Sequence, residues 1–231
     1  MIIDTHCHFD MMPQPEAYIQ RIEKAGDIVI GMTNLPSHYQ MGAAHIAGYK
    51  HVRLALGLHP LLAADNKQEI TLFEKLVDST SYIGEIGLDF SKEGYMTKDT
   101  QIEVLRKLLG ILKGKNKIIS VHSRRAERDL FDLLCEYDIK NVIFHWYSGA
   151  VSLIPEIIER GYYFSVNEAM TLSRSGQAIL KAIPRDRMLT ETDAPFNGNS
   201  DIKKAIAYLG LSENEVYSNF KCLLNRLRQI Q

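Results

Sequence analysis

Short apolar runs that recur between longer amphipathic segments constrain this chain more than any other feature. Eight runs of five to seven residues have the length and the β-branched composition of buried strands. They are Ile2–His8, Asp27–Thr33, Val52–Leu58, Tyr82–Gly87, Ile118–His122, Asn141–His145, Tyr162–Val166 and Arg187–Thr192. Strands that alternate with helices form a parallel sheet, because each crossover helix returns the chain to the same edge.

The segments between these runs carry apolar residues at helical spacing. They are Pro15–Ala25, Glu69–Asp78, Thr100–Leu112, Glu127–Tyr137, Leu153–Arg160 and Arg174–Ile183, and Ile202–Leu209 and Ser212–Arg228 follow the last strand. Ser212 and Glu215 have the S-x-x-E spacing of a helix capping box. This pair predicts where the last helix begins.

The number of strand–helix units indicates the architecture. Eight units share 231 residues, and a (β/α)8 barrel typically has about 250 residues. We therefore predict an α/β fold of the (β/α)8 TIM-barrel type that occupies a single domain, residues 1–231. An open, doubly wound sheet is the alternative.

Composition excludes several classes of protein. Hydrophobic residues make up 45% and charged residues 24% of the chain, which excludes a disordered or coiled-coil protein. The net charge of -1 argues against a general polyanion binder, because such proteins attract phosphates with many basic side chains. Three scattered cysteines do not form a disulfide framework. There is neither a membrane-spanning apolar run nor a signal peptide, so we expect a cytoplasmic protein that does not contact membranes.

Two histidines close the first predicted strand, as His6-Cys7-His8. Side chains alternate faces along a strand, so His6 and His8 point the same way, about 7 Å apart, and Cys7 points into the core. Asp4 and Asp10 have the same parity and are expected to orient the two imidazoles. This pattern predicts that His6 and His8 can bind one metal ion together.

Further metal-binding side chains follow other strands. Glu85, His122, His145 and Asp193 lie at the carboxyl ends of the fourth, fifth, sixth and eighth runs. In a parallel barrel these ends share one rim, where active sites lie. Together with the first strand, the predicted ligands are His6, His8, Glu85, His122, His145 and Asp193. Six ligands exceed the needs of one tetrahedral ion and suit two divalent ions, Zn²⁺, Mn²⁺ or Mg²⁺.

Six short motifs, in order along the chain, resemble those of the TatD family of metal-dependent deoxyribonucleases. They are DTHCHFD at Asp4–Asp10, GLHP at Gly57–Pro60, GEIGLDF at Gly84–Phe90, VHSR at Val121–Arg124, HWYSG at His145–Gly149 and TETDAPF at Thr190–Phe196. The family belongs to the amidohydrolase-like, metallo-dependent hydrolase barrels. The loop after Phe196, residues 197–201, is shorter than the family's usual loop.

The resemblance implies which residues hold each ion. One ion would be held by His6, His8, Glu85 and Asp193, and the other by Glu85, His122 and His145, with Glu85 as the bridge. Asp193 and Glu85 would be the catalytic residues, with Asp193 as the group that takes the proton from water.

The resemblance also implies a substrate and partners. The implied substrate is DNA, either single strands or DNA ends. The implied reaction is hydrolysis by water that two metal ions activate, and in this family it often proceeds from 3′ to 5′. The motifs also resemble those of TatD-like nucleases in anti-phage defence. Other subunits of such a defence system are therefore implied as partners.

Three residues near the predicted rim are candidates for binding the substrate. Arg124 offers a planar fork for phosphate oxygens, and Trp146 offers a ring on which a base can stack. His59 follows the third strand and is expected either to reach the substrate or to cap the loop before Pro60. Asp89 is expected to orient a metal ligand or a loop.

The neighbours of these residues have simpler interpretations. Arg125 is as well explained by a solvated helix start, and Tyr147 by packing against the neighbouring loop.

Two other functions remain open from the sequence. One is a small-molecule metallohydrolase, such as a lactonase or phosphotriesterase. Those enzymes often bridge their metals with a carboxylated lysine on the fourth strand, where this chain has Glu85. The other is a subunit of a defence complex that is active only together with its partners.

Overall fold

All eight predicted strands are present in the computed structural model, which describes residues 1–198 and 200–228. The strands are β1 Ile3–Cys7, β2 Ile28–Gly31, β3 Val52–Leu54, β4 Tyr82–Gly87, β5 Ile118–His122, β6 Val142–His145, β7 Tyr163–Val166 and β8 Met188–Thr190. Every ladder is parallel, in a sheet β1-β2-β3 and a sheet β4-β5-β6-β7-β8.

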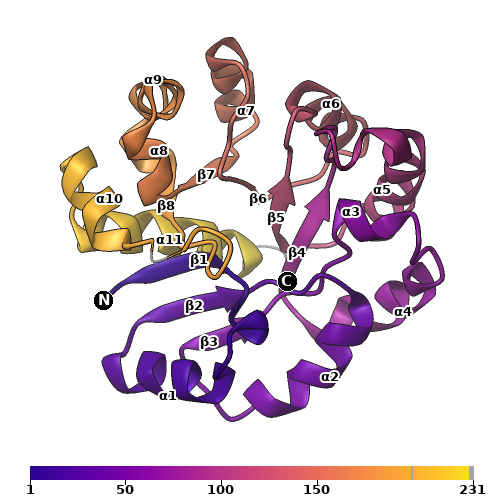
Figure 1. The fold of residues 1–231 in the computed structure, drawn as a ribbon, viewed down its shortest axis with the longest axis horizontal. Coiled ribbons are helices and arrows are strands. Elements are labelled where there is room, and N and C mark those ends of the chain that lie inside the picture. The colour runs from indigo at the N-terminus through magenta and orange to yellow at the C-terminus, as the bar shows by residue number, and fades with distance from the viewer. Residues whose placement is uncertain (199, 229–231) are drawn as a thin grey trace.

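Two seams join the sheets into a closed barrel (Figure 1). Between β3 and β4, the backbone N–H of Leu56 donates to the carbonyl of Tyr82, with the N and O atoms 3.0 Å apart. Between β8 and β1, the N–H of Asp193 donates to the carbonyl of His6 at 3.0 Å. The barrel prediction is therefore confirmed, and the open sheet is excluded.

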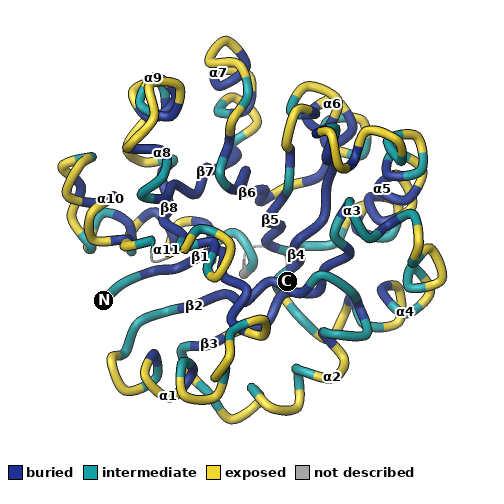
Figure 2. Tube along the Cα trace, in the orientation of Figure 1, coloured by how far each residue is buried: buried dark blue, intermediate teal, exposed yellow. Residues whose placement is uncertain are grey.

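Helices surround the barrel, so the buried part of the chain lies at the centre and the exposed part outside (Figure 2). They are α1 Pro15–Ala25, α2 Pro36–Ile46, α3 Pro60–Ala63, α4 Glu69–Leu76, α5 Lys98–Leu112, α6 Glu127–Glu136, α7 Ile154–Glu159, α8 Glu168–Leu172, α9 Arg174–Ala182, α10 Ile202–Leu209 and α11 Glu213–Arg228. Five 3₁₀ turns accompany them in the described residues: η1 Phe9–Met11, η2 Val77–Ser79, η3 Tyr95–Thr97, η4 Val151–Leu153 and η5 Arg185–Arg187.

Three helices were not predicted from the sequence, and four strands end earlier than predicted. Helices α3 and α8 are short, and α2 has small and polar residues where an amphipathic stripe is expected. The strands that end early are β1 at Cys7, β2 at Gly31, β3 at Leu54 and β8 at Thr190. Beyond Thr190, the N–H of Thr192 donates to the Asp4 carboxylate instead of continuing the ladder.

The predicted capping box is confirmed at the start of α11. The N–H of Glu215 donates to Ser212 Oγ at 3.2 Å, and the N–H of Ser212 donates to Glu215 Oε2 at 2.8 Å. Two backbone donors at this helix end are thus satisfied by side chains. Among the described residues, no helix is both long and apolar enough to cross a membrane.

Glycine at position 87 lets β4 and β5 approach each other at the site end of the barrel. Gly87 has a φ of +147°, and a Cβ there would lie 2.0 Å from the carbonyl oxygen of His122. Only glycine fits this conformation and this distance. The position of His122 therefore depends on Gly87.

We predict that Gly87→Ala lowers the free energy of unfolding by more than about 2 kcal/mol, because the backbone of β5 must move. Gly110→Ala is the matched control, since Gly110 is an exposed residue of α5 with a negative φ and no atom closer than 3.9 Å to the new Cβ. It should stabilise the helix by about 1 kcal/mol. Urea unfolding of both variants measures the difference; equal effects would contradict the close approach.

Candidate metal centre

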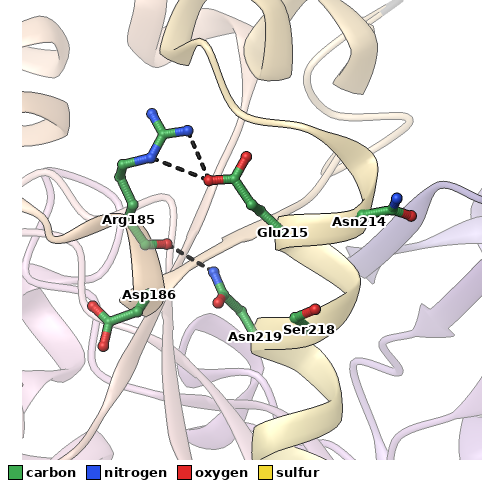
Figure 3. A pocket seen from close by; sticks show the side chains of 6 residues that line it. All are labelled: Arg185, Asp186, Asn214, Glu215, Ser218 and Asn219. Carbon is green, nitrogen blue, oxygen red and sulfur yellow. Dashed lines mark hydrogen bonds and ion pairs between the residues drawn. The ribbon is translucent and has the colours of Figure 1, made fainter.

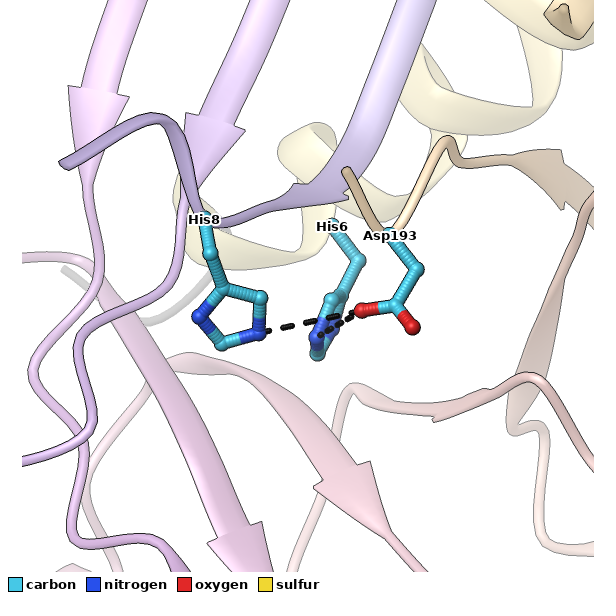
Figure 4. Close-up of side chains that lie close together, drawn as sticks. All are labelled: His6, His8 and Asp193. Carbon is cyan, nitrogen blue, oxygen red and sulfur yellow. Dashed lines mark ion pairs between the residues drawn. The ribbon is translucent and has the colours of Figure 1, made fainter. Parts of the chain in front are cut away.

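The six predicted ligands converge at the carboxyl ends of the strands. His6 and His8 extend from β1 toward Asp193, which follows β8 (Figure 4). The Nε2 atoms of His6 and His8 each lie 3.7 Å from Asp193 Oδ1. The two ring centroids are 5.2 Å apart, so the strand does present both rings to one side. Cys7 is fully buried, in agreement with its prediction as a core residue.

Glu85 lies between the histidines of β1 and those of β5 and β6. Its Oε2 is 3.4 Å from His8 Nε2 and 3.6 Å from His6 Nε2. Its Oε1 is 2.5 Å from His122 Nδ1 and 2.8 Å from His145 Nε2. The Nε2 atom of His59 also lies 3.6 Å from Oε2, so the two carboxylate oxygens face separate groups of imidazoles.

Electrostatics favour a charged Glu85. Burial alone raises the pKa of this carboxyl, but the facing imidazoles of His59, His145 and His122 hold the pKa well below its usual value. The pKa of His145 shifts the other way: burial lowers it, while the carboxylates of Glu85 and Glu191 raise it well above its usual value. The site therefore concentrates charge in a buried volume.

The donor atoms fit divalent cations. Three groups of ligand atoms each lie within 4.8 Å of one another: His6, His8 and Asp193; His6, Glu85 and His145; and His59, Glu85 and His122. His6 Nε2, which faces this cluster, is buried without a hydrogen-bond partner in the described part of the chain. Buried nitrogens normally have partners, so this one suits a cation. Imidazole and carboxylate without thiolate fit Zn²⁺, Mn²⁺ or Mg²⁺.

Neighbouring polar groups hold two of the rings in place. Ser120 Oγ lies 2.8 Å from His6 Nδ1, and Asp89 Oδ2 lies 2.8 Å from His122 Nε2. Burial raises the pKa of Asp89, but hydrogen bonds from His122 and Ser91 outweigh this and lower the pKa to about 2. Sequence reasoning identified Asp89 but missed Ser120, because a serine inside a strand carries no motif.

The expected role of Asp4 and Asp10 is wrong. Asp4 accepts hydrogen bonds from the N–H and Oγ1 of Thr192, at 3.0 Å and 2.6 Å, so it ties β1 to the segment after β8. Asp10 is exposed on η1 and bonds to neither ring in the described residues. Side-chain parity placed Asp4 correctly on the inner face of β1, but its carboxylate accepts hydrogen bonds from Thr192 instead of from the imidazoles.

A cavity of about 630 Å³ opens above the ligands. Its wall includes the predicted substrate-binding residues His59, Arg124 and Trp146, and also Phe196. The Phe196 ring is 58% exposed and meets the His8 ring edge-on at 5.0 Å, so it can contact a bound molecule. Phe196 was not predicted as a cavity residue, because the direction of its side chain depends on the conformation of the loop.

Two neighbours of these residues follow their simpler interpretations. Tyr147 is buried and meets the ring of Phe164 in β7 edge-on at 5.4 Å, so it packs in the interior. Its hydroxyl donates to the carbonyl of Ala150 in its own loop at 2.8 Å. Arg125 is exposed and does not line the cavity.

A second hollow of about 440 Å³ lies where the chain enters β8, at the other end of that strand (Figure 3). Arg185 pairs with Glu215 at 2.8 Å, and the side chain of Asn219 donates to the carbonyl of Arg185 at 2.7 Å. These contacts fasten α11 to the barrel. No predicted site residue lies in this hollow, so we assign it a structural role.

A closed barrel with a buried histidine–carboxylate cluster at its rim defines a metal-dependent hydrolase. The model of the family "TatD related DNase" matches residues 3–213, so the chain belongs to this family.

Several relatives carry the same class of activity in their names. The uncharacterized metal-dependent hydrolase YabD of Bacillus subtilis is 31% identical over 212 residues, covering 85% of this chain and 81% of its own. Human deoxyribonuclease TATDN3 is 28% identical over 216 residues, covering 85% and 79%. The crystal structure of the TatD homologue YjjV of Escherichia coli superimposes with a TM-score of 0.84 and 24% identity, covering 98% and 97%, which confirms the fold.

We predict that Mn²⁺ binds more tightly as the pH rises from about 5.5 to about 8. Burial raises the pKa of Asp193 to about 7, so protons compete with the cation for this carboxylate below that pH and leave it above. For each proton that the cation displaces, the affinity for Mn²⁺ rises by up to about tenfold per pH unit. Calorimetric titration measures the trend, and Asp193→Asn should flatten it. An affinity independent of pH would contradict a role for Asp193 as a ligand.

Proposed function

We propose that this protein hydrolyses phosphodiester bonds of DNA by two-metal activation of water, acting on single strands or DNA ends, from 3′ to 5′. The observation that carries the proposal is Glu85, whose two oxygens face separate groups of imidazoles. A bridging carboxylate on β4, in place of a lysine, favours a nuclease over a lactonase or phosphotriesterase. The deoxyribonuclease name of the human relative supports the same substrate.

Each ion has a proposed set of ligands. The first set is His6, His8, Glu85 and Asp193, and the second is Glu85, His122 and His145. When bound, the two divalent ions, Zn²⁺, Mn²⁺ or Mg²⁺, lower the pKa of a water molecule and neutralise charge on the phosphate. Asp193 is proposed to take the proton of that water, because its Oδ1 lies 3.7 Å from the Nε2 atoms of both His6 and His8 and is therefore next to the place where the water would be activated.

His59 is proposed to donate a hydrogen bond to the phosphate. Its Nδ1 accepts the N–H of Leu61 at 3.2 Å at the start of α3, so the proton of the neutral ring lies on Nε2. Nε2 faces the cavity, 3.6 Å from Glu85 Oε2. Burial lowers the pKa of His59 to about 4, which keeps the ring neutral, and a neutral donor can remain beside the cations.

The cavity wall suits one end of a nucleic acid. Trp146 and Phe196 offer ring surfaces on which a base can stack. Among the lining residues that the structure describes, Glu85, Asp89 and Asp193 are acidic and Arg124 is the basic side chain. Phosphate binding therefore depends on the bound cations, with Arg124 as an outer contact; its side chain is 59% exposed and 3.8 Å from Glu93.

We further propose a biological setting. The motifs resemble the TatD-like nuclease component of the Qat anti-phage defence system, which would act in the cytoplasm with other defence-system subunits. The chain would act there as one catalytic domain, residues 1–231, of which 199 and 229–231 lie outside the described residues. Because the loop 197–201 is short, we propose that a partner subunit completes the mouth of the cavity.

We predict that the pure chain cleaves end-labelled DNA in a metal-dependent way and that Glu85→Gln abolishes cleavage. The amide keeps the shape of Glu85 but cannot bridge two cations. Glu136→Gln is the control, since Glu136 is exposed and pairs with Arg106 on the outer helices. If the chain binds two metal ions but cuts DNA only when partner proteins are added, it is a subunit of a complex that is active only with its partners. Activity on esters or lactones alone would overturn the nuclease.

We predict that Arg124→Ala weakens single-strand binding and reduces the slope of log affinity against log salt by about 0.7 to 1, because one phosphate contact is lost. Arg125→Ala is the matched control, because this neighbour does not line the cavity. Fluorescence anisotropy at several salt concentrations measures both slopes. Equal slopes for the two variants would remove Arg124 from phosphate binding.

A further inference from the structure

We propose that Glu191 is a positioning residue that holds His145 in the tautomer that a cation at its Nε2 requires. The inference rests on the metal centre of the proposed function, but not on the identity of the substrate. Glu191 lies between Thr190 and Thr192, directly after β8, and its side chain was not among the predicted site residues.

Glu191 is a fully buried acid that neutral donors surround. Ser165 Oγ donates to Glu191 Oε2, and Asn167 Nδ2 donates to Glu191 Oε1 at 2.9 Å. All three residues are 0% exposed. No lysine or arginine pairs with Glu191 in the described part of the chain. An acid that accepts two hydrogen bonds at such a depth serves a specific purpose, because burying it is costly.

The orientation of Asn167 makes the arrangement unambiguous. Asn167 is the N-cap of α8, and its Oδ1 accepts the N–H of Met170 at 3.2 Å. Its amide NH₂ group must therefore point the other way, toward Glu191. The helix cap thus holds Oε1, which is the oxygen beside His145, while Ser165 holds only the other oxygen of Glu191.

The group next to this fixed carboxylate is His145. Glu191 Oε1 lies 3.8 Å from His145 Nδ1, which is buried without any hydrogen-bond partner in the described residues. On its other side, the His145 ring stacks on His6, with centroids 3.9 Å apart. A shift of less than about 1 Å closes the Nδ1 to Oε1 hydrogen bond.

The position of the proton explains why His145 needs this acceptor. Without a cation, His145 Nε2 can donate a hydrogen bond to Glu85 Oε1, 2.8 Å away. A cation at Nε2 displaces that proton, so the neutral ring must carry its hydrogen on Nδ1. In that state Nδ1 is a donor, and Glu191 is the acceptor beside it. The charge on Glu191 also makes the ring a stronger ligand.

Glu191 and Asp89 then have corresponding roles. Asp89 holds His122 through a direct contact of 2.8 Å, and Glu191 stands behind His145. Each histidine of the second proposed ligand set is thus supported by its own carboxylate. Such carboxylates typically contribute about 10- to 100-fold in metal affinity.

The first test is Zn²⁺ binding by Glu191→Gln, measured by competition with a chromogenic chelator. We expect one of the two binding steps to weaken by about 10- to 100-fold, while the other step and the circular dichroism spectrum stay as in the wild type. Ser165→Ala is the matched control, because it removes the other hydrogen bond of Glu191 and leaves the contact with His145. It should lower the melting temperature but change Zn²⁺ affinity by less than about threefold.

The second test uses the wild-type protein and therefore does not depend on whether a variant folds. In Zn²⁺-loaded, ¹⁵N-histidine-labelled wild-type protein, we expect a low-field Nδ1–H signal from His145, as for a hydrogen bond to a carboxylate. If Glu191→Gln folds, this signal should move upfield.

Three results would overturn the inference. They are wild-type affinity in Glu191→Gln, an equal loss of affinity in Ser165→Ala, and a His145 ring that carries its proton on Nε2 in the loaded protein. A wild-type chain that binds no Zn²⁺ would overturn the metal centre itself, and with it this inference. Loss of DNA cleavage with normal Zn²⁺ binding would instead affect only the proposed substrate.

Discussion

The arrangement of the rim depends on one buried carboxylate that faces imidazoles on two sides. Glu85 is 2% exposed, and its oxygens lie within 3.6 Å of ring nitrogens from β1, β5 and β6 and from the loop after β3. In a site that excludes water, such interactions are strong, and an unbalanced charge is costly. The cluster therefore holds charged groups of both signs together, and its donor atoms fit cations.

The barrel supplies the positions that this balance requires. Its two seams bring β1 next to β8 and β3 next to β4, so side chains from five strands reach one rim. Close backbone approaches help, as at Gly87, where a larger residue would displace β5. Around the cluster, Ser120 and Asp89 orient individual rings. Rigid strands and these outer hydrogen bonds together give the precision that a metal site needs.

Much of this could be predicted because it depends on local periodicity. The alternation of strands and helices gave the barrel, and the parity of His6 and His8 placed both rings on one side. Strand ends and weakly amphipathic helices were less predictable. Helix α2 lacks an apolar stripe, and the segment after β8 leaves the ladder because Asp4 captures the N–H of Thr192. Such competition between partners distant in sequence leaves no local signal.

The sequence by itself determined which side chains stand at the strand ends, because strand period and chain direction fix those places. Only the tertiary structure decided which of them meet. Asp4 and Glu191 illustrate the difference: both are acids within the quoted motifs, yet one binds Thr192 and the other lies behind His145. Contacts between strands as separate as β6 and β8 depend on register, tilt and the depth of each residue in the barrel. These quantities arise only when the sheet closes.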